Sequence, residues 1–222
     1  MLQSNDPGLE FVNYYGNTSN FALRILRTHG ELKTMNLLSL GCLMPHLADY
    51  LAIFRSVYHV TMATTRLPFA VEQSPAKLVL LQQDFFTLQS LQVDCVISHA
   101  AIHCFNDSRY GNVHSPPGFQ KPYQAPAKLR EVVGDRPMPT IVSIAVNRQE
   151  GFFDNNAHLS HDKFVAAFAH AGFELKDYFF DYVCGGIPQK PEYLNAEYRR
   201  SRKLPQVCQS PKQWVVGNYY FL

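Results

Sequence analysis

Short apolar, β-branched runs alternate with helix-like stretches along most of this 222-residue chain, and this alternation restricts its fold more than any other feature. We expect strands over 35–40, 57–62, 76–81, 93–98, 139–146 and 174–183, and a last strand over 213–222. Helical spacing predicts helices over 19–29, 46–54, 127–134 and 160–171. Ser160 is a suitable N-cap for the last of these. Continuous apolar strands between helices are typical of a mostly parallel sheet covered on both faces.

The segments between these elements indicate one domain over 1–222. Residues 106–126 and 147–159 are rich in polar and turn-forming residues and are expected to be loops. Residues 1–34 indicate an N-terminal helical extension, and the proline-rich stretch 185–211 indicates an excursion before the last strand. We expect an α/β, Rossmann-like open sheet, in which the final strand is antiparallel and pairs with its predecessor at the sheet edge.

The composition excludes several classes of function. A formal net charge of +2 is too small to indicate a nucleic-acid-binding face. The dense basic run from Arg199 to Lys203 is either a solvated surface segment or a contact for an anionic partner. No apolar run is long enough to span a membrane. Five cysteines without a CxxC pair favour reduced thiols in a cytoplasmic protein. Neither a P-loop nor a Gly-x-Ser-x-Gly elbow occurs in the sequence.

Chemically useful side chains follow the predicted strands, at the edge where open parallel sheets bind ligands. His103 and His158 are candidates for a catalytic base, because imidazole titrates near neutral pH. Structural hydrogen bonding is the alternative for both histidines. The planar fork of Arg109 could hold a carboxylate or a phosphate, or form a surface salt bridge. The spacing of His158 and His161 matches no compact metal-site signature, so no metal is expected.

The order of the elements resembles that of class I S-adenosylmethionine (SAM) dependent methyltransferases over about residues 20–222. That family has an acidic residue and a glycine-rich loop at the end of the first strand. Leu40-Gly41-Cys42 matches the common Gly-Cys start of the loop, whereas Ser39 stands at the acidic position. Leu43 and Pro45 replace the later glycines, which let the backbone approach the cofactor. The resemblance implies that SAM lies over Leu40, Gly41 and Cys42.

The resemblance also assigns roles to the ends of the next strands. Thr61 lies near the end of the second strand, where the family has an acidic residue that holds the ribose. Asp84, with its neighbour Phe85, matches a position that contacts adenine in the family, although Asp84 could equally be a helix-cap residue. Ser98 and His99, at the end of the fourth strand, match positions that line the cleft of the cofactor and the substrate.

Two short segments are similar to an uncharacterised branch of methyltransferase-like proteins from nematodes and bacterial polysaccharide gene clusters. Arg109-Tyr110-Gly111 and Asn156-Ala157-His158 match that branch as they stand, whereas Asn112 and Leu159 depart from it. The resemblance implies that Arg109, Tyr110, Asn155 and Asn156 contact the substrate.

Two main hypotheses for the function follow. The first is a SAM-dependent methyltransferase-like enzyme that acts on a small polar or sugar-like acceptor. The second is a non-catalytic methyltransferase-like protein with a degenerate cofactor site, used for partner binding; the replaced glycines and the missing ribose acid favour it. A third hypothesis is an enzyme that binds another nucleotide or a nucleotide sugar on the same sheet.

Overall fold

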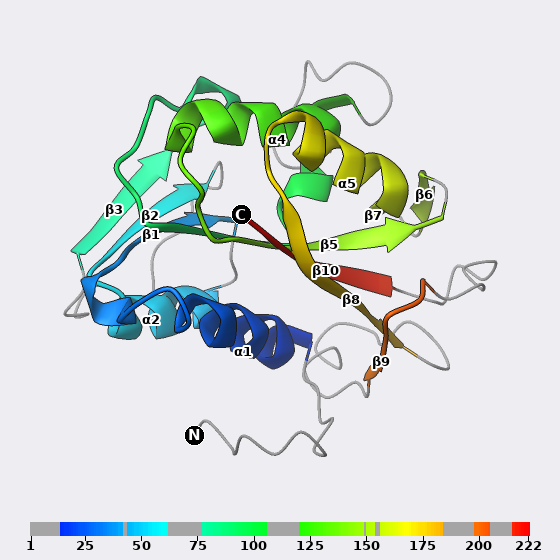
Figure 1. Cartoon of the computed structure of the whole chain (residues 1–222), viewed down its shortest axis with the longest axis horizontal. Helices are drawn as coiled ribbons and strands as arrows, with labels where there is room; N and C mark the ends of the chain where they lie inside the picture. The colour runs from blue at the N-terminus through cyan, green and yellow to red at the C-terminus, as the bar shows by residue number, and fades with distance from the viewer. Residues whose placement is uncertain are drawn as a thin grey trace.

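Helices cover both faces of one mixed sheet (Figure 1). The computed structural model describes residues 14–41, 44–61, 77–105, 120–148, 150–153, 156–183, 198–204 and 215–222. Within these segments, strands and helices alternate along the chain as the apolar runs predict. The predicted α/β class, with a mostly parallel sheet and an antiparallel final strand, is confirmed.

The sheet has the strand order β3-β2-β1-β4-β5-β10-β8-β9. Its strands are β1 Asn36–Leu40, β2 Ser56–Thr61, β3 Lys77–Gln82, β4 Cys95–His99, β5 Thr140–Asn147, β8 Leu175–Val183, β9 Tyr198–Ser201 and β10 Val215–Phe221. The strands from β3 across to β5 pair in parallel. Strand β10 is antiparallel to both β5 and β8, and β9 is antiparallel to β8. The final strand therefore lies between β5 and β8, inside the sheet and not at its edge.

A short hairpin extends the sheet beyond the end of β5. It is formed by β6 Gly151–Phe153 and β7 Asn156–Ser160, which pair antiparallel. Strand β7 also pairs in parallel with the last residues of β5, where Val146 is opposite Leu159. The prediction of a loop over 147–159 is therefore wrong for most of that segment, because this backbone finds its hydrogen-bond partners in β5 and in the hairpin.

The helices form two layers. They are α1 Tyr14–Leu26, α2 Met44–Ile53, α4 Gln120–Val133 and α5 His161–His170, with 3₁₀ turns η1 Leu32–Thr34, η2 Phe85–Thr87 and η3 Ile102–Cys104. Helices α1 and α2 cover one face of the sheet, and α4 and α5 cover the other (Figure 1). Phe21 of α1 meets Phe179 of β8 edge-on, with ring centroids 4.7 Å apart. On the opposite face, Phe168 of α5 stacks on Phe221 of β10 at 4.0 Å.

Two local predictions need correction. Helix α4 begins at Gln120, seven residues before the predicted helix over 127–134. Pro122 lies in its first turn, where a missing N–H costs nothing, and Pro126 is tolerated inside the helix while both rings are buried. Ser160 occupies the N-cap position of α5 as predicted, but its side chain makes no capping bond. Its backbone N–H instead donates to the hydroxyl of Tyr123 at 2.9 Å.

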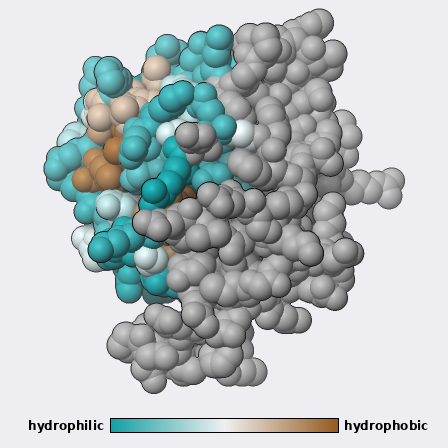
Figure 2. All heavy atoms as spheres, turned by 90° about the vertical axis from the view of Figure 1, so that its right-hand side faces the viewer, coloured by the Kyte–Doolittle hydropathy of each residue, from teal (hydrophilic) through white to brown (hydrophobic). Residues whose placement is uncertain are grey.

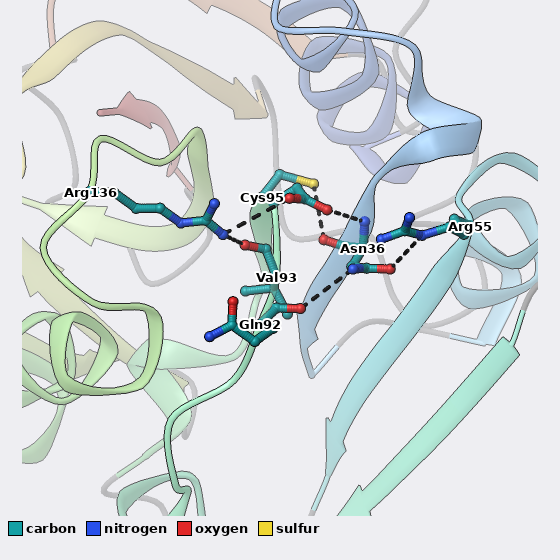
Figure 3. Close-up of polar contacts among 7 residues, drawn as sticks. Asn36, Arg55, Gln92, Val93, Cys95 and Arg136 are labelled. Atoms are coloured by element: carbon teal, nitrogen blue, oxygen red, sulfur yellow. Dashed lines mark hydrogen bonds and ion pairs between the residues drawn. The ribbon is translucent and has the colours of Figure 1, made fainter.

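Polar groups tie together the amino ends of the central strands (Figure 3). Asn36 and Asp94 bond twice, because the N–H of Asn36 donates to Asp94 Oδ2 at 2.8 Å and the N–H of Asp94 donates to the Asn36 carbonyl at 2.8 Å. Arg55, just before β2, donates from Nε to Asn36 Oδ1 at 3.0 Å. Arg136, before β5, donates to the Val93 carbonyl. This edge is therefore occupied by structural contacts, and the opposite edge carries the chemically useful side chains.

Arg130 joins the ends of α4 and α5 on the other layer. Its guanidinium donates to backbone carbonyls at both helix ends, those of Gly134, Arg136, Ala171 and Gly172, over 2.8–3.1 Å. The same group lies over the ring of Phe173, 3.7 Å from its centroid. All four carbonyls lie beyond the last residues of the two helices, Val133 and His170, so one side chain satisfies several polar groups at once.

We expect Arg130→Met to lower the free energy of unfolding by about 2 kcal/mol, because several backbone carbonyls lose their donor together. Urea unfolding followed by circular dichroism measures the change. Lys128→Met on the same helix is the control. It removes an ion pair with the exposed Glu131 and is expected to cost less than about 0.5 kcal/mol. Equal losses of unfolding free energy in the two variants would show that the bonds of Arg130 stabilise the fold no more than an exposed ion pair does.

Candidate functional site

The strand order reverses between β1 and β4, and this reversal positions the candidate site. Chain crossovers from these two neighbouring parallel strands leave in opposite directions, so their carboxyl ends border a crevice in folds of this kind. Both strands end on a residue with left-handed backbone. Gly41 follows β1 with a φ of 55°, and Ala100 follows β4 with a φ of 52°. A left-handed alanine costs about 1 kcal/mol, and such strain is concentrated at functional sites.

The two turns are held against each other and against their neighbours. A Cβ atom added to Gly41 would lie 2.5 Å from the Cβ of Ala101, so only glycine fits this approach. The N–H of Gly41 donates to the carbonyl of Val60 at 3.3 Å. The N–H of Ala100 donates to the carbonyl of Ser143 at 2.8 Å. The carboxyl ends of β1, β2, β4 and β5 thus form one connected edge.

The residues predicted to contact the cofactor differ in their access to this edge. Gly41 is exposed and Thr61 is half-buried. Leu40 is a core residue with 1% exposure. The Oγ atom of Ser98 is fully buried, and within the described segments it has no hydrogen-bond partner. Cys42 lies outside the described residues. Of the predicted cofactor contacts, Gly41 and Thr61 are therefore accessible, and the half-buried Asp84 is a third accessible residue.

Asp84 and Phe85 lie at the end of β3. The Oδ1 atom of Asp84 accepts the N–H of Phe86 at 3.0 Å, which caps η2. Its other oxygen lies 3.9 Å from Nζ of Lys121. Phe85 is buried and stacks on Phe105 with centroids 5.2 Å apart. The helix-cap alternative for Asp84 is thus present in the structure, and Phe85 contributes to the core.

Ser98 and His99 face opposite sides of the sheet, because successive strand residues alternate. His99 points toward the α2 layer, where its Nε2 lies 2.6 Å from the hydroxyl of Tyr50. Its Nδ1 lies 3.3 Å from Oγ of Ser143 on β5. Tyr50 is fully buried and His99 has 4% exposure. The sequence predicted His99 as a cleft residue but did not identify Tyr50 or Ser143.

The contacts of His99 continue across the sheet as a row of polar side chains, which we call the polar row and which is buried except for Arg200 at its end. Its members, in spatial order, are Tyr50, His99, Ser143, Asn218, Asp181 and Arg200. The strand members Ser143, Asn218 and Asp181 have exposures of 0%, 0% and 2%. A polar residue inside an apolar strand costs free energy unless it is bonded, so Ser143 and Asn218 were the sequence signal for this row.

A second polar pair lies on the same face of the neighbouring strands. Nδ1 of His59 on β2 lies 3.3 Å from Oγ of Ser39 on β1. Burial lowers the pKa of His59 to about 4. Ser39 stands where the methyltransferase family has an acidic residue, and here its hydroxyl is buried against this neutral imidazole.

The two predicted catalytic histidines lie on elements that pack together. His103 is in η3 after β4, His158 is in β7 after β5, and η3 contacts β7. Both side chains have 4% exposure. Asn156 begins β7, and its side chain is not described. Arg109, Tyr110 and Asn155 lie outside the described residues. The structure thus brings the elements of His103 and His158 together and does not test the predicted substrate contacts.

The hairpin that carries His158 is anchored by a group of polar contacts. The hydroxyl of Tyr123 donates to Glu150 Oε2 at 2.9 Å, and Lys163 Nζ donates to Glu150 Oε1 at 2.9 Å. The hydrogen bond from Lys163 lowers the pKa of Glu150. Because Tyr123 also receives the N–H of Ser160, helix α4 is joined to both ends of the hairpin segment.

The described surface on the side toward which β5 points is mainly hydrophilic, with one small hydrophobic area (Figure 2). Within the basic run from Arg199 to Lys203, Arg200 pairs with Asp181, and Arg202 pairs with Asp177. Part of the charge of this run is therefore balanced within the chain. Among the described residues, no helix is both long and apolar enough to cross a membrane.

The fold is that of class I SAM-dependent methyltransferases of known structure. A 1,6-didemethyltoxoflavin-N1-methyltransferase from Burkholderia thailandensis matches 91% of this chain and 77% of its own at 11% identity, with a TM-score of 0.55. The N-methyltransferase NodS from Bradyrhizobium japonicum, in complex with S-adenosyl-L-homocysteine, matches 99% and 93% at 9% identity, with a TM-score of 0.57. The [4+2]-cyclase SpnF matches 85% and 66% at 13% identity, with a TM-score of 0.54. Neither a protein-family model nor a curated protein sequence matches the chain.

We expect Gly41→Ala to cost about 2 kcal/mol more stability than Gly134→Ala, because only the former forces two chain segments apart. Both glycines have a positive φ, but a Cβ at Gly134 would meet nothing within 4 Å. The control therefore measures the cost of the left-handed backbone alone, which is about 1 kcal/mol. Free energies of urea unfolding give the comparison. Indistinguishable values would contradict the close approach of β1 and β4.

Proposed function

We propose that this chain is a SAM-dependent methyltransferase-like enzyme that acts on a small polar or sugar-like acceptor. The proposal rests on one observation, at the sheet edge where the strand order reverses between β1 and β4. There the exposed, side-chain-free Gly41 lies against Ala101, in a sheet with the fold of SAM-dependent methyltransferases. The missing Cβ lets the two turns close against each other, and the exposed backbone of Gly41 beside them stays accessible to a ligand.

The residues present fit such a cofactor in two respects. The backbone at Gly41 is exposed, and the buried hydroxyl of Ser98 has no partner in the segments that the structure describes. We assign the methionine part of the cofactor to Leu40, Gly41 and Cys42, and the ribose to Thr61. We assign the adenine side to Asp84 and Phe85, and the adjoining wall to Ser98 and His99. When bound, SAM supplies a methyl group activated by its sulfonium sulfur.

The protein's own contribution to methyl transfer is alignment of the acceptor and removal of its proton. We assign proton removal to His103 and His158, whose elements pack together after β4 and β5. Arg109, Tyr110, Asn155 and Asn156 would hold the polar groups of the acceptor. This assignment extends the likeness to the branch from nematodes and bacterial polysaccharide gene clusters, and it is the basis for a sugar-like acceptor.

A non-catalytic protein with the same fold is the second candidate, and Asp84 favours it. Its carboxylate already accepts the N–H of Phe86 and faces Lys121, so binding adenine would compete with structural contacts. Thr61 offers the ribose no charge-assisted hydrogen bond. The likeness to a cyclase also agrees with the general observation that one fold hosts different functions.

Calorimetric titration with S-adenosylhomocysteine tests the proposal. We expect micromolar binding, about −8 kcal/mol. Asp84→Asn should weaken it about tenfold, because the neutral amide is a poorer acceptor for the adenine amino group. Glu131→Gln, an exposed carboxylate on α4, is the control and should leave the affinity unchanged. If the titration gives no heat and millimolar ligand gives no thermal shift, SAM-dependent catalysis by this chain is refuted. That result would favour the non-catalytic candidate.

Ser98→Ala should separate stability from binding. The variant removes a buried hydroxyl that has no partner among the described residues, so the free protein should gain about 1 kcal/mol of stability. If Ser98 contacts the cofactor, the same variant loses about fivefold in affinity for S-adenosylhomocysteine. Thermal unfolding and calorimetry measure the two effects. A stabilised variant with unchanged affinity would remove Ser98 from the cofactor site.

A further inference from the structure

The segments that follow β3 and β4 meet, although β2 and β1 lie between these strands in the sheet. Phe85 in η2 stacks on Phe105, just after η3, with ring centroids 5.2 Å apart. Phe86 meets both rings edge-on, at 5.4 and 5.7 Å. Phe86 and Phe105 are half-buried, so part of each side chain is accessible. These three rings, which we call the aromatic cluster, join the carboxyl ends of β3 and β4 on the side of the sheet that α4 covers.

Lys121 and Asp84 place a cation and an anion beside the aromatic cluster. Lys121 is the second residue of α4, and its Nζ lies over the ring of Phe86, 5.6 Å from the centroid. The same nitrogen is 3.9 Å from Oδ2 of Asp84. Attraction to the ring and to the carboxylate together holds the ammonium in place. The two side chains have exposed fractions of 21% and 32%, so both remain partly accessible to a ligand.

The two facing atoms of this pair can still bond a ligand. At 3.9 Å, Nζ of Lys121 and Oδ2 of Asp84 attract each other but are too far apart for a hydrogen bond. The N–H of Phe86 donates to the other oxygen, Oδ1, so the cap of η2 does not use Oδ2. Among the described residues, Nζ of Lys121 makes no hydrogen bond. An ion pair of this kind adds little stability, so a ligand that separates it loses little.

A carboxylate beside an ammonium matches the polar edge of adenine. Adenine presents its amino group as a donor next to a ring nitrogen that accepts, and a side-chain amide binds this edge with one oxygen and one nitrogen. Oδ2 of Asp84 and Nζ of Lys121 offer the same two kinds of atom. Their charges make both hydrogen bonds stronger than those of a neutral amide. The accessible parts of Phe86 and Phe105 supply the apolar contact that a flat base also needs.

We propose that Lys121 is a specificity-determining residue of the adenine site, and that its ammonium donates a hydrogen bond to a ring nitrogen beside the amino group. This inference rests on the proposed function, in which Asp84 accepts a hydrogen from that amino group. Asp84 alone distinguishes one atom of the base, whereas the pair distinguishes two adjacent atoms and rejects a base in which either is altered. The ion pair is then the arrangement of the site without its ligand, and the ligand's edge enters between the two charges.

Calorimetric titration with S-adenosylhomocysteine and its 1-deaza and 7-deaza analogues tests this role of Lys121. Each analogue replaces one ring nitrogen beside the amino group by C–H and keeps the amino group itself. We expect one of the two analogues to bind the unmodified chain about tenfold more weakly than S-adenosylhomocysteine, because the ammonium loses its acceptor. In Lys121→Met, the same analogue and S-adenosylhomocysteine should bind within about twofold of each other. A lysine with a purely structural role would not change this difference between ligands.

Three further variants complete the comparison. Lys128→Met is the matched control, because it removes a lysine of the same helix whose side chain has a similar exposed fraction, 18%. It should keep the tenfold difference between the ligands. Lys121→Arg keeps a cationic donor and should retain at least about a threefold difference. If Lys121→Met does not fold, Lys121→Ala takes its place, since alanine is the best helix former.

The outcomes separate this inference from the proposed function. The role of Lys121 is overturned if neither analogue binds the unmodified chain more weakly, or if the difference persists in Lys121→Met. In both cases S-adenosylhomocysteine still binds, and the proposed function survives without Lys121. If S-adenosylhomocysteine does not bind the unmodified chain, the proposed function fails, and the role of Lys121 in the adenine site fails with it.

Discussion

Burial of the sheet on both faces is the constraint on which the rest of this structure depends. Helices exclude water from the central strands, so each polar side chain placed there must find its partner inside the protein. The strands are therefore mainly aliphatic and aromatic, and their few polar residues are not scattered. Ser143, Asn218 and Asp181 occupy neighbouring strands and bond to one another. The polar row is therefore a consequence of burial.

The same constraint explains why chemistry is concentrated at one edge. At the amino ends of the strands, Asn36 and Asp94 exchange two hydrogen bonds. The side chain of Asn36 also bonds to the Gln92 carbonyl and to Arg55 (Figure 3). At the carboxyl ends, the chain turns away from β1 and β4 through two left-handed residues, Gly41 and Ala100. The left-handed backbone of Ala100 is strained, and the buried hydroxyl of Ser98 lies just before this edge. An edge with strain and unused polar groups is better suited to a ligand than one whose groups are all paired.

Much of the fold could be predicted because it depends on local patterns. The strand β1 and the helix α5 each correspond to a periodic apolar run, and both lie within about two residues of their predicted bounds. The predictions failed where partners distant in sequence decide the structure. Residues 151–160 form strands because they pair with each other and with β5, and α4 extends through Pro122 and Pro126 because their rings are buried. The position of β10 between β5 and β8 is also a long-range outcome.

The candidate site could be predicted only in part, for the same physical reason. Gly41 was identified from a short motif, and His99 from its place after a strand. Asn218 carried a local signal only as a polar residue inside an apolar strand, and Tyr50 and Asp181 were not identified, because hydrogen bonds that cross 49, 75 and 37 positions of sequence do not show which residues pair. These distant residues nevertheless fix the position of His99, because Tyr50 and Ser143 contact its two ring nitrogens. A buried imidazole needs such partners, and only the fold brings them to it, so the sheet builds this part of the site through contacts that no local pattern shows.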